Sequence, residues 1–485
     1  MIFSLLLLLA VLKCVAGFRV LFLAGEGKSP YGATSPCPEP EWHDVASQLA
    51  ARLRVFDERI DARVSTNLRV SEPYDVVVAL GVDDVVLETR PTCLLADPAV
   101  SSVEAFAGDY APGSRPFLPW SPIARGKRVV EQAATLLARA STEDSCYAVL
   151  LALHALVGPI PVVAADINPS WDKGFRNILE FAKMIRCCGP EIFRALTDPP
   201  TKKAVDLLNS LDLRDQVGSY RVIVSTETEE LEAFSLCILQ QNNCFNADAE
   251  ILTRPAVPAL AEWRGRPLDD EASRDILVGH FPELTWSWKI VCGANPAYDA
   301  FPMQHQIFYP ARQGLWYDPV FCVETIDGTR VWTKRHYRCV KRGMGLWTLT
   351  TLDNGVVSKE HWTIVDCEDD LSWAVLYYSG AAKAAGQSYQ GALLCSRDGK
   401  WPDGAHVGTS TYDRIRDAFG RCGLELFELY GHGPPIEGRR DASFMWNDDF
   451  LQWAADNPPP LDPIGDISIM AWKRAQRRLL KTTSL

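Results

Sequence analysis

The sequence predicts an α+β protein with several domains. An N-terminal α/β unit is followed by a helical segment that contains cysteines, then by an eight-stranded antiparallel β-barrel with a C-terminal helix. Apolar runs alternate with helical patterns up to residue 165, whereas short alternating, aromatic-rich runs fill residues 283–400. The boundaries that we predict are 1–17, 18–165, 166–280, 281–437 and 438–485.

The composition is that of a folded protein with an acidic surface. Of the 485 residues, 47% are hydrophobic and 23% are charged, which supports a normal core and excludes general disorder. Lys and Arg number 49 against 61 Asp and Glu, a net charge of −12. Because no basic stripe offsets this charge, we expect no nucleic-acid partner.

The N-terminus resembles a secretory signal peptide. Residues 1–17 form an apolar run that ends in Val15-Ala16-Gly17, the small-residue pattern of a cleavage site. The run is too short for a comfortable transmembrane helix. The alternative to a signal peptide is a buried first strand of the folded protein. Cleavage would remove Cys14 from the 14 cysteines and leave an odd number, so at least one would be free or intermolecular.

Continuous apolar strands and helices alternate in the next segment, which predicts a parallel sheet covered on both faces. The turn at Gly25 and Gly27 lacks the GxGxxG pattern of a dinucleotide site. Beyond it, residues 166–280 are predicted to be mostly helical, and a proline-rich stretch at 254–258 reads as a linker. The strands predicted in the α/β unit are 19–24, 74–80 and 93–97, with a helix at 42–55; the later helices are 177–185, 190–196, 201–213 and 229–241.

Eight short runs at roughly ten-residue spacing predict an up-and-down antiparallel barrel. The turns Asp327-Gly328 and Asp353-Asn354-Gly355 favour tight hairpins. A helix is predicted at Thr411–Leu429, and a barrel followed by such a helix is the plan of a lipocalin, with space inside for one small ligand. The runs are 286–292, 304–309, 320–325, 331–340, 345–351, 361–365, 373–378 and 392–396.

The stretch from Trp288 to Tyr309 reads WKIVCGANPAYDAFPMQHQIFY. It resembles the first two barrel strands of the violaxanthin de-epoxidase family, and the likeness extends over about residues 180–437. It implies a lipocalin-like barrel. The supporting motifs are Thr325–Gly328, Trp332–Arg335, Tyr377-Tyr378-x-Gly380, Tyr389-x-Gly391, Ser396-Arg397 and the stretch from Glu232 to Cys237 with Cys244.

The resemblance implies a xanthophyll epoxide reductase of the photoprotective xanthophyll cycle. The family removes the epoxide oxygen as water with ascorbate as reductant, which needs a general acid. Asp299, in the most specific motif, is implied to be that acid; the alternative is an exposed aspartate in the Asn-Pro turn. The implied substrate-binding residues, each of which could instead be an ordinary core or surface residue, are Trp288, Tyr298, Phe301, Gln304, Tyr377 and Tyr378.

Where the sequence departs from the family, a second function stays open. Pro302 stands where the family has a second acid, and the cysteine-rich region is thinned to Cys187, Cys188, Cys237 and Cys244, which remain disulfide candidates. The alternative function is therefore a non-catalytic carrier of a carotenoid or lipid. No metal spacing and no flavin or nicotinamide fingerprint occurs, so we expect no metal and no bound cofactor, and ascorbate as a diffusible co-substrate.

The expected partner is a xanthophyll such as violaxanthin or diadinoxanthin. A thylakoid membrane surface and a second copy of the chain are further candidate partners. A secretory-type leader followed by Phe18 resembles the leaders of algae with complex plastids, which implies the plastid, in the thylakoid lumen; plain secretion is the alternative.

Overall fold

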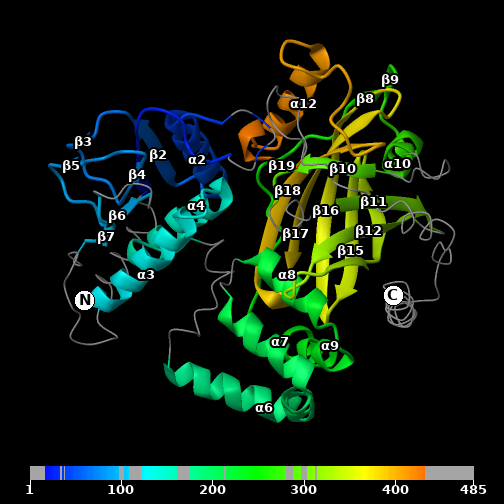
Figure 1. The fold of residues 1–485 in the computed structure, drawn as a ribbon, viewed down its shortest axis with the longest axis horizontal. Coiled ribbons are helices and arrows are strands. Elements are labelled where there is room, and N and C mark those ends of the chain that lie inside the picture. The colour runs from blue at the N-terminus through cyan, green and yellow to red at the C-terminus, as the bar shows by residue number, and fades with distance from the viewer. Residues whose placement is uncertain are drawn as a thin grey trace, which may run out of the picture. The chain divides into compact units, whose positions relative to one another are not determined.

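The computed structural model describes residues 17–32, 35, 37, 39–97, 103–108, 122–160, 174–211, 215–279, 288–295, 303–311 and 314–431. The predicted leader, apart from Gly17, lies outside these residues. The chain divides into two compact units, which Figure 1 shows in the colours of the sequence. The first comprises Met1–Ile167 and Gly423–Glu428, and the second comprises Asn168–Cys422 and Leu429–Leu485.

The first unit is built on a five-stranded sheet in the order β2-β1-β4-β6-β7. The first four of these strands run parallel, and β7 is an antiparallel edge strand. The strands β1 and β4 are almost wholly apolar and buried, as expected of a sheet covered on both faces. The predicted α/β unit is confirmed. The bounds are β1 (Phe18–Ala24), β2 (Ile60–Ser65), β4 (Val76–Leu80), β6 (Cys93–Ala96) and β7 (Phe106–Ala107), with a separate pair β3 (Arg69–Val70) and β5 (Val86–Leu87).

Among the described residues, three helices pack with this sheet in the first unit: α2 (Trp42–Phe56), α3 (Pro122–Leu137) and α4 (Thr142–Leu156). Many α/β folds bind phosphates at the carboxyl ends of the parallel strands. In this unit the backbone of the loops at Gly25 and Gly81 and the indole of Trp42 pack closely at the ends of β1 and β4. A Cβ atom at Gly25 would lie 1.7 Å from the carbonyl oxygen of Gly81, and one at Gly81 would lie 2.2 Å from Nε1 of Trp42. The two glycines therefore allow two loops and a tryptophan to pack without a gap.

A short stretch from late in the sequence completes the first unit. Residues 423–428, here called the return segment, contain a 3-10 turn, η5 (Leu426–Glu428). The carboxylate of Glu428 is buried and accepts a hydrogen bond from Arg52 at 2.7 Å and another from Gln48 at 2.5 Å. The hydroxyl of Ser35 donates to the carbonyl oxygen of Leu426 at 3.0 Å.

The return segment corrects one prediction. The helix predicted at Thr411–Leu429 is wrong in its second half, because α12 (Ser410–Arg421) already ends at Arg421. Gly423 follows with a φ of +75°, a left-handed conformation that stops a helix. After the return segment, β19 (Tyr430–Gly431) pairs with a strand of the second unit.

The second unit begins with helices α6 (Gly174–Thr197), α7 (Pro199–Ser210), α8 (Gln216–Ser225) and α9 (Glu229–Ser235), then a π-helical turn, η2 (Leu236–Gln241). The two helices predicted at 177–185 and 190–196 form one helix with a kink at Cys188, two residues before Pro190. A disulfide joins Cys188 to Cys237, and Cys187 and Cys244 lie in the same apolar cluster as free thiols. One disulfide therefore joins two of the four candidates.

The connection to the barrel contains a hairpin of β8 (Glu262–Trp263) and β9 (Arg266–Pro267), then α10 (Asp270–Val278). Figure 1 shows α10 beside one end of the barrel, and α7 and α9 beyond the other. The indole nitrogen of Trp288 donates to the carbonyl oxygen of Ile276 at 2.8 Å, and that of Trp347 donates to Ser273 at 3.0 Å. Among the described helices, none combines the length and apolarity that a membrane crossing requires.

The barrel consists of eight described strands in antiparallel pairs. It closes because β10 pairs with both β11 and β18, and β12 pairs with both β11 and β14. The predicted barrel is confirmed. Its strands are β10 (Trp288–Gly293), β11 (Met303–Pro310), β12 (Leu315–Glu324), β14 (Tyr337–Gly343), β15 (Leu346–Asp353), β16 (Val356–Cys367), β17 (Trp373–Ala382) and β18 (Gln387–Ser396), with a 3-10 turn η4 (Lys383–Ala385) before β18.

One predicted strand, 331–340, is wrong: it is two strands, β13 (Arg330–Lys334) and β14. The break falls at Arg335, whose buried side chain forms ion pairs with Asp353 at 2.8 Å and with Glu227 at 3.1 Å. Glu227 precedes α9, and Asp353 ends β15. Arg335 lies outside both strands and pairs with Glu227 and Asp353, so its ion pairs connect the helical segment to the barrel.

We predict that Arg335→Ala lowers the free energy of unfolding by about 3–5 kcal/mol, because it leaves two carboxylates without their buried cation. Arg416→Ala is the matched control, since Arg416 pairs with Asp413 and Asp417 on the surface of α12 and its loss should have little effect. Equilibrium unfolding in guanidinium chloride measures both. Equal losses in the two variants would contradict the role given to Arg335.

Candidate functional site

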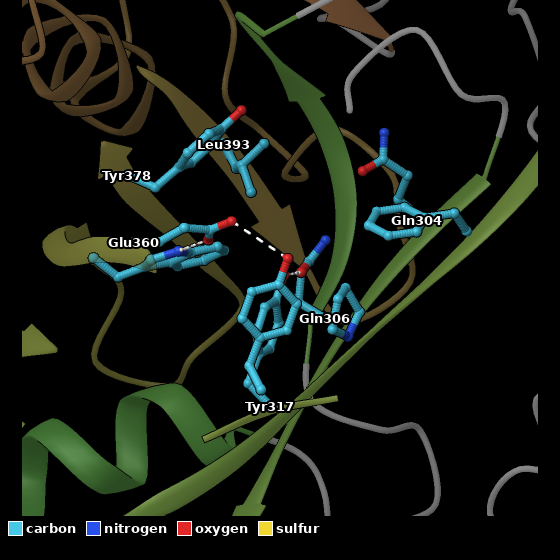
Figure 2. A pocket seen from close by; sticks show the side chains of 10 residues that line it. Gln304, Gln306, Tyr317, Glu360, Tyr378 and Leu393 are labelled. Carbon is cyan, nitrogen blue, oxygen red and sulfur yellow. Dashed lines mark hydrogen bonds between the residues drawn. The ribbon is translucent and has the colours of Figure 1, made fainter. Parts of the chain in front are cut away.

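The interior of the barrel contains a small cavity lined by ten residues from six strands (Figure 2). The space open to the centre of a water-sized sphere is about 20 Å³, room for little more than one water molecule. The lining residues are Gln304 and Gln306 of β11; Tyr317, Pro319 and Phe321 of β12; Tyr337 of β14; Glu360 and Trp362 of β16; Tyr378 of β17; and Leu393 of β18.

These side chains point inward because of the period of the strands. Side chains alternate between the two faces of a strand, so Glu360 and Trp362 share the inner face of β16. Trp362 stacks on Tyr378, with ring centroids 5.5 Å apart and planes 26° apart. The cavity is thus an aromatic chamber with a few polar groups, the usual composition of a small-molecule site.

Glu360 is the acidic group of this chamber, and it is 3% exposed. One carboxylate oxygen, Oε2, accepts a hydrogen bond from the indole nitrogen of Trp362 at 2.6 Å. The other, Oε1, accepts from the hydroxyl of Tyr389 at 2.8 Å and, at 3.5 Å, from that of Tyr337. The donors come from β16 itself and from two other strands, β18 and β14, and all three are neutral groups.

Burial raises the pKa of Glu360 above its usual range, because the charged form loses its hydration. The hydrogen bonds from Trp362, Tyr389 and Tyr337 act in the opposite direction and lower the pKa, but burial is the larger effect. None of the ten lining residues carries a positive charge that would favour the carboxylate. The carboxyl can therefore hold a proton at a pH where a surface glutamate would have lost it.

Two glutamines of β11 supply the other polar groups. Gln306 accepts a hydrogen bond from the hydroxyl of Tyr317. The amide oxygen of Gln304, a residue 3% exposed, has no hydrogen-bond partner among the residues that the structure describes. Figure 2 shows Gln304 on the opposite side of the group of labelled residues from Glu360. A buried amide without a partner is unfavourable, so Gln304 is suited to bind a polar group of a ligand.

The structure brings only some of the predicted site residues together. Gln304 and Tyr378 line the cavity. Trp288 instead packs at the end of the barrel against α10, and Tyr377 lies on the other face of β17, where its hydroxyl donates to Gln390 at 3.1 Å. The remaining predictions, Asp299, Tyr298 and Phe301, lie outside the described residues, as does Pro302.

Sequence reasoning missed Glu360. The signal was present in the alternation of β16, where Glu360 shares a strand face with the apolar Trp362 and Ile364. A glutamate on the apolar face of a barrel strand is unusual, because an unpaired buried charge is costly.

We predict that the stability of the wild type falls relative to Glu360→Gln as the pH rises. With a raised pKa in the folded state, Glu360 contributes stability below the pKa of an unfolded glutamate, about 4.3, and loses it as the pH rises through the folded-state pKa. The glutamine stays neutral throughout. Thermal unfolding between pH 4 and 8 measures the difference. Glu324→Gln, at an exposed position on β12, is the control, and parallel curves for wild type and Glu360→Gln would contradict the prediction.

Comparison with known proteins finds solved structures of low identity to this chain. No curated protein sequence matches the chain. Among solved structures, the siderocalin Ex-FABP, which functions through dual ligand specificities, is 13% identical, with 32% of this chain and 97% of that chain covered and a TM-score of 0.23. Apocrustacyanin C1 is 12% identical (37% and 91% covered, TM-score 0.23), and lobster apocrustacyanin A1 is also 12% identical (37% and 91%, TM-score 0.21).

The sequence model of the VDE lipocalin domain matches residues 180–430, which is more than half of the chain. The match begins within α6 and takes in the later helices, the disulfide, every strand of the barrel and α12. The closed antiparallel barrel that encloses Glu360 is therefore the barrel of this domain, and the chain belongs to the violaxanthin de-epoxidase family.

Proposed function

We propose that the barrel binds a xanthophyll and reduces its epoxide, with ascorbate as the reductant and Glu360 as the proton donor. The observation that carries the proposal is a buried carboxyl with a raised pKa on the wall of an aromatic cavity. Such a group keeps its proton to a higher pH than a surface glutamate does and can deliver it inside a site that excludes water. The family assignment supplies the reaction class, and the cavity supplies the acid.

The chemistry requires a proton because an epoxide oxygen is a poor leaving group. In the proposed reaction both carbon–oxygen bonds of the epoxide break, a carbon–carbon double bond forms, and the oxygen leaves as water. Ascorbate supplies the two electrons and is oxidised to dehydroascorbate, and its two protons balance the water that forms. Glu360 gives its proton to the epoxide oxygen and is reprotonated when the reductant is consumed.

The other lining residues orient the substrate and the acid. Trp362 and Tyr389 hold the two oxygens of Glu360 in place. Gln304 is available to bind the hydroxyl of a xanthophyll end ring, and the stacked pair of Trp362 and Tyr378 offers an apolar wall. Because the cavity holds little more than one water, lining side chains must move apart when a ring enters.

Asp299 remains a second candidate for the proton donor, on the strength of its motif alone. The expected location in the thylakoid lumen is part of the same proposal. An acidic compartment would keep a carboxyl of raised pKa protonated and would favour turnover. We therefore expect activity to fall as the pH rises through the raised pKa of Glu360.

A second candidate function is a carrier that binds a carotenoid or lipid without turnover. One observation favours it: both oxygens of Glu360 already accept hydrogen bonds from protein donors. In a carrier, these hydrogen bonds would only stabilise a buried carboxyl, without any proton transfer to a ligand. Fold alone does not separate an enzyme from a carrier, because barrels of this kind serve both.

We predict that Glu360→Gln lowers turnover by about 10²–10⁴, the usual worth of general acid catalysis, and leaves pigment binding intact. The purified full chain is incubated with violaxanthin or diadinoxanthin and ascorbate between pH 5 and pH 7.5, and pigments are separated by chromatography. Glu324→Gln is the matched control for a glutamate outside the cavity.

Each outcome separates two hypotheses. Unchanged turnover in Glu360→Gln with a loss in Asp299→Asn would transfer the acid role to Asp299. Tight pigment binding by a wild type that turns over neither pigment would favour the carrier. Absence of both binding and turnover would reject both functions.

A further inference from the structure

We propose that Gly380 is a positioning residue: by having no side chain, it lets Tyr389 reach across strand β17 and hold the carboxyl of Glu360. The inference deepens the proposed function, on which its catalytic meaning rests. It concerns a residue that touches neither ligand nor reacting atoms but decides where the hydrogen-bond donor of the acid lies.

The register of three strands places the residues in one row. Glu360 of β16 pairs with Gly380 of β17, and Gly380 pairs with Tyr389 of β18. The hydroxyl of Tyr389 nevertheless donates to Oε1 of Glu360 at 2.8 Å, although a whole strand separates them. The tyrosine ring therefore lies over the middle residue of the row.

That middle position has no room for a side chain. A Cβ atom at Gly380 would lie 2.5 Å from Cε2, 2.6 Å from Cζ and 2.8 Å from the hydroxyl oxygen of Tyr389. These separations are far below van der Waals contact, so the two groups cannot coexist. Because the clash falls on the far end of a side chain, the ring can swing away while the backbone stays in place.

The neighbouring row repeats the arrangement without the carboxyl. Tyr378 pairs with Gly391, and a Cβ at Gly391 would lie 2.6 Å from the hydroxyl oxygen of Tyr378. The opposite end of that row is Trp362, on which Tyr378 stacks. A glycine opposite a tyrosine thus occurs twice between β17 and β18. In the Gly380 row the tyrosine donates a hydrogen bond to Glu360.

The surroundings of Glu360 make this one donor matter. Among the residues that the structure describes, the titratable side chains near the carboxyl are Tyr337 and Cys339 from β14, Tyr317 from β12, Tyr378 from β17 and Tyr389 from β18. Tyrosine and cysteine side chains ordinarily lose their protons only above pH 7, and burial raises the pKa of the Cys339 thiol further. Hydrogen bonds, and not neighbouring charges, therefore tune the acid.

The test follows the titration of Glu360 in the full chain without any substrate. Tryptophan fluorescence is recorded against pH, and the part that disappears in Glu360→Gln is assigned to Glu360, whose carboxyl accepts from Trp362. A lost donor favours the neutral acid. We expect Gly380→Ala and Tyr389→Phe to move the midpoint to higher pH by the same amount, and the double variant to move it no further.

Gly420→Ala is the matched control, because a Cβ at this position on α12 meets no atom within 4 Å; its midpoint should equal that of the wild type. A wild-type midpoint in Gly380→Ala, a double variant that shifts beyond either single one, or no titration linked to Glu360 would each overturn the proposal. Turnover is measured separately. A wild type without activity would reject the proposed function, but the titration of Glu360, which needs no substrate, could still be interpreted.

Discussion

The burial of one carboxyl group, Glu360, constrains the barrel around it. A carboxyl without water needs donors in the protein, and its neutral form is favoured. Burial raises the pKa of Glu360, and its two oxygens accept hydrogen bonds from Trp362 and Tyr389. The donors come from its own strand and from β18, with Tyr337 on β14 farther away. A register slip of one residue in any of these strands would turn a donor to the outer face.

The same need explains why aromatic residues line the cavity. Tyrosine and tryptophan offer a large apolar ring and a single hydrogen-bond donor, so they can satisfy a buried carboxyl without adding charge. The cavity stays small because these rings pack on one another, as Trp362 does on Tyr378. In the proposed reaction the acid is in place before the cavity has room for a ring of the ligand, so ligand entry and side-chain movement must be coupled.

The sequence predicted the architecture well, because the strands and helices follow local patterns. Apolar runs predicted the parallel sheet, and alternation with hairpin turns predicted the barrel. Local patterns did not predict the break at Arg335 or the partners of Glu360, because both depend on residues that meet only in the fold. Arg335 contacts Glu227, 108 residues away, and Glu360 contacts Tyr389, 29 residues away. The motif that contains Asp299 is local and can be read from the sequence, whereas the partners of Glu360 are set by the fold.

The return segment affects how a gene for this protein could be rearranged. The α/β unit looks like a cassette that could be gained or lost by recombination at its boundary, yet one of its buried ion pairs joins Arg52 to Glu428 across the whole length of the barrel sequence. A crossover anywhere between residues 168 and 422 would separate the two, and losing one partner of a buried pair is strongly destabilising. A simple end-to-end fusion of the two units therefore does not explain this chain. Either the barrel was inserted into the α/β unit, or residues 423–428 were selected after the fusion.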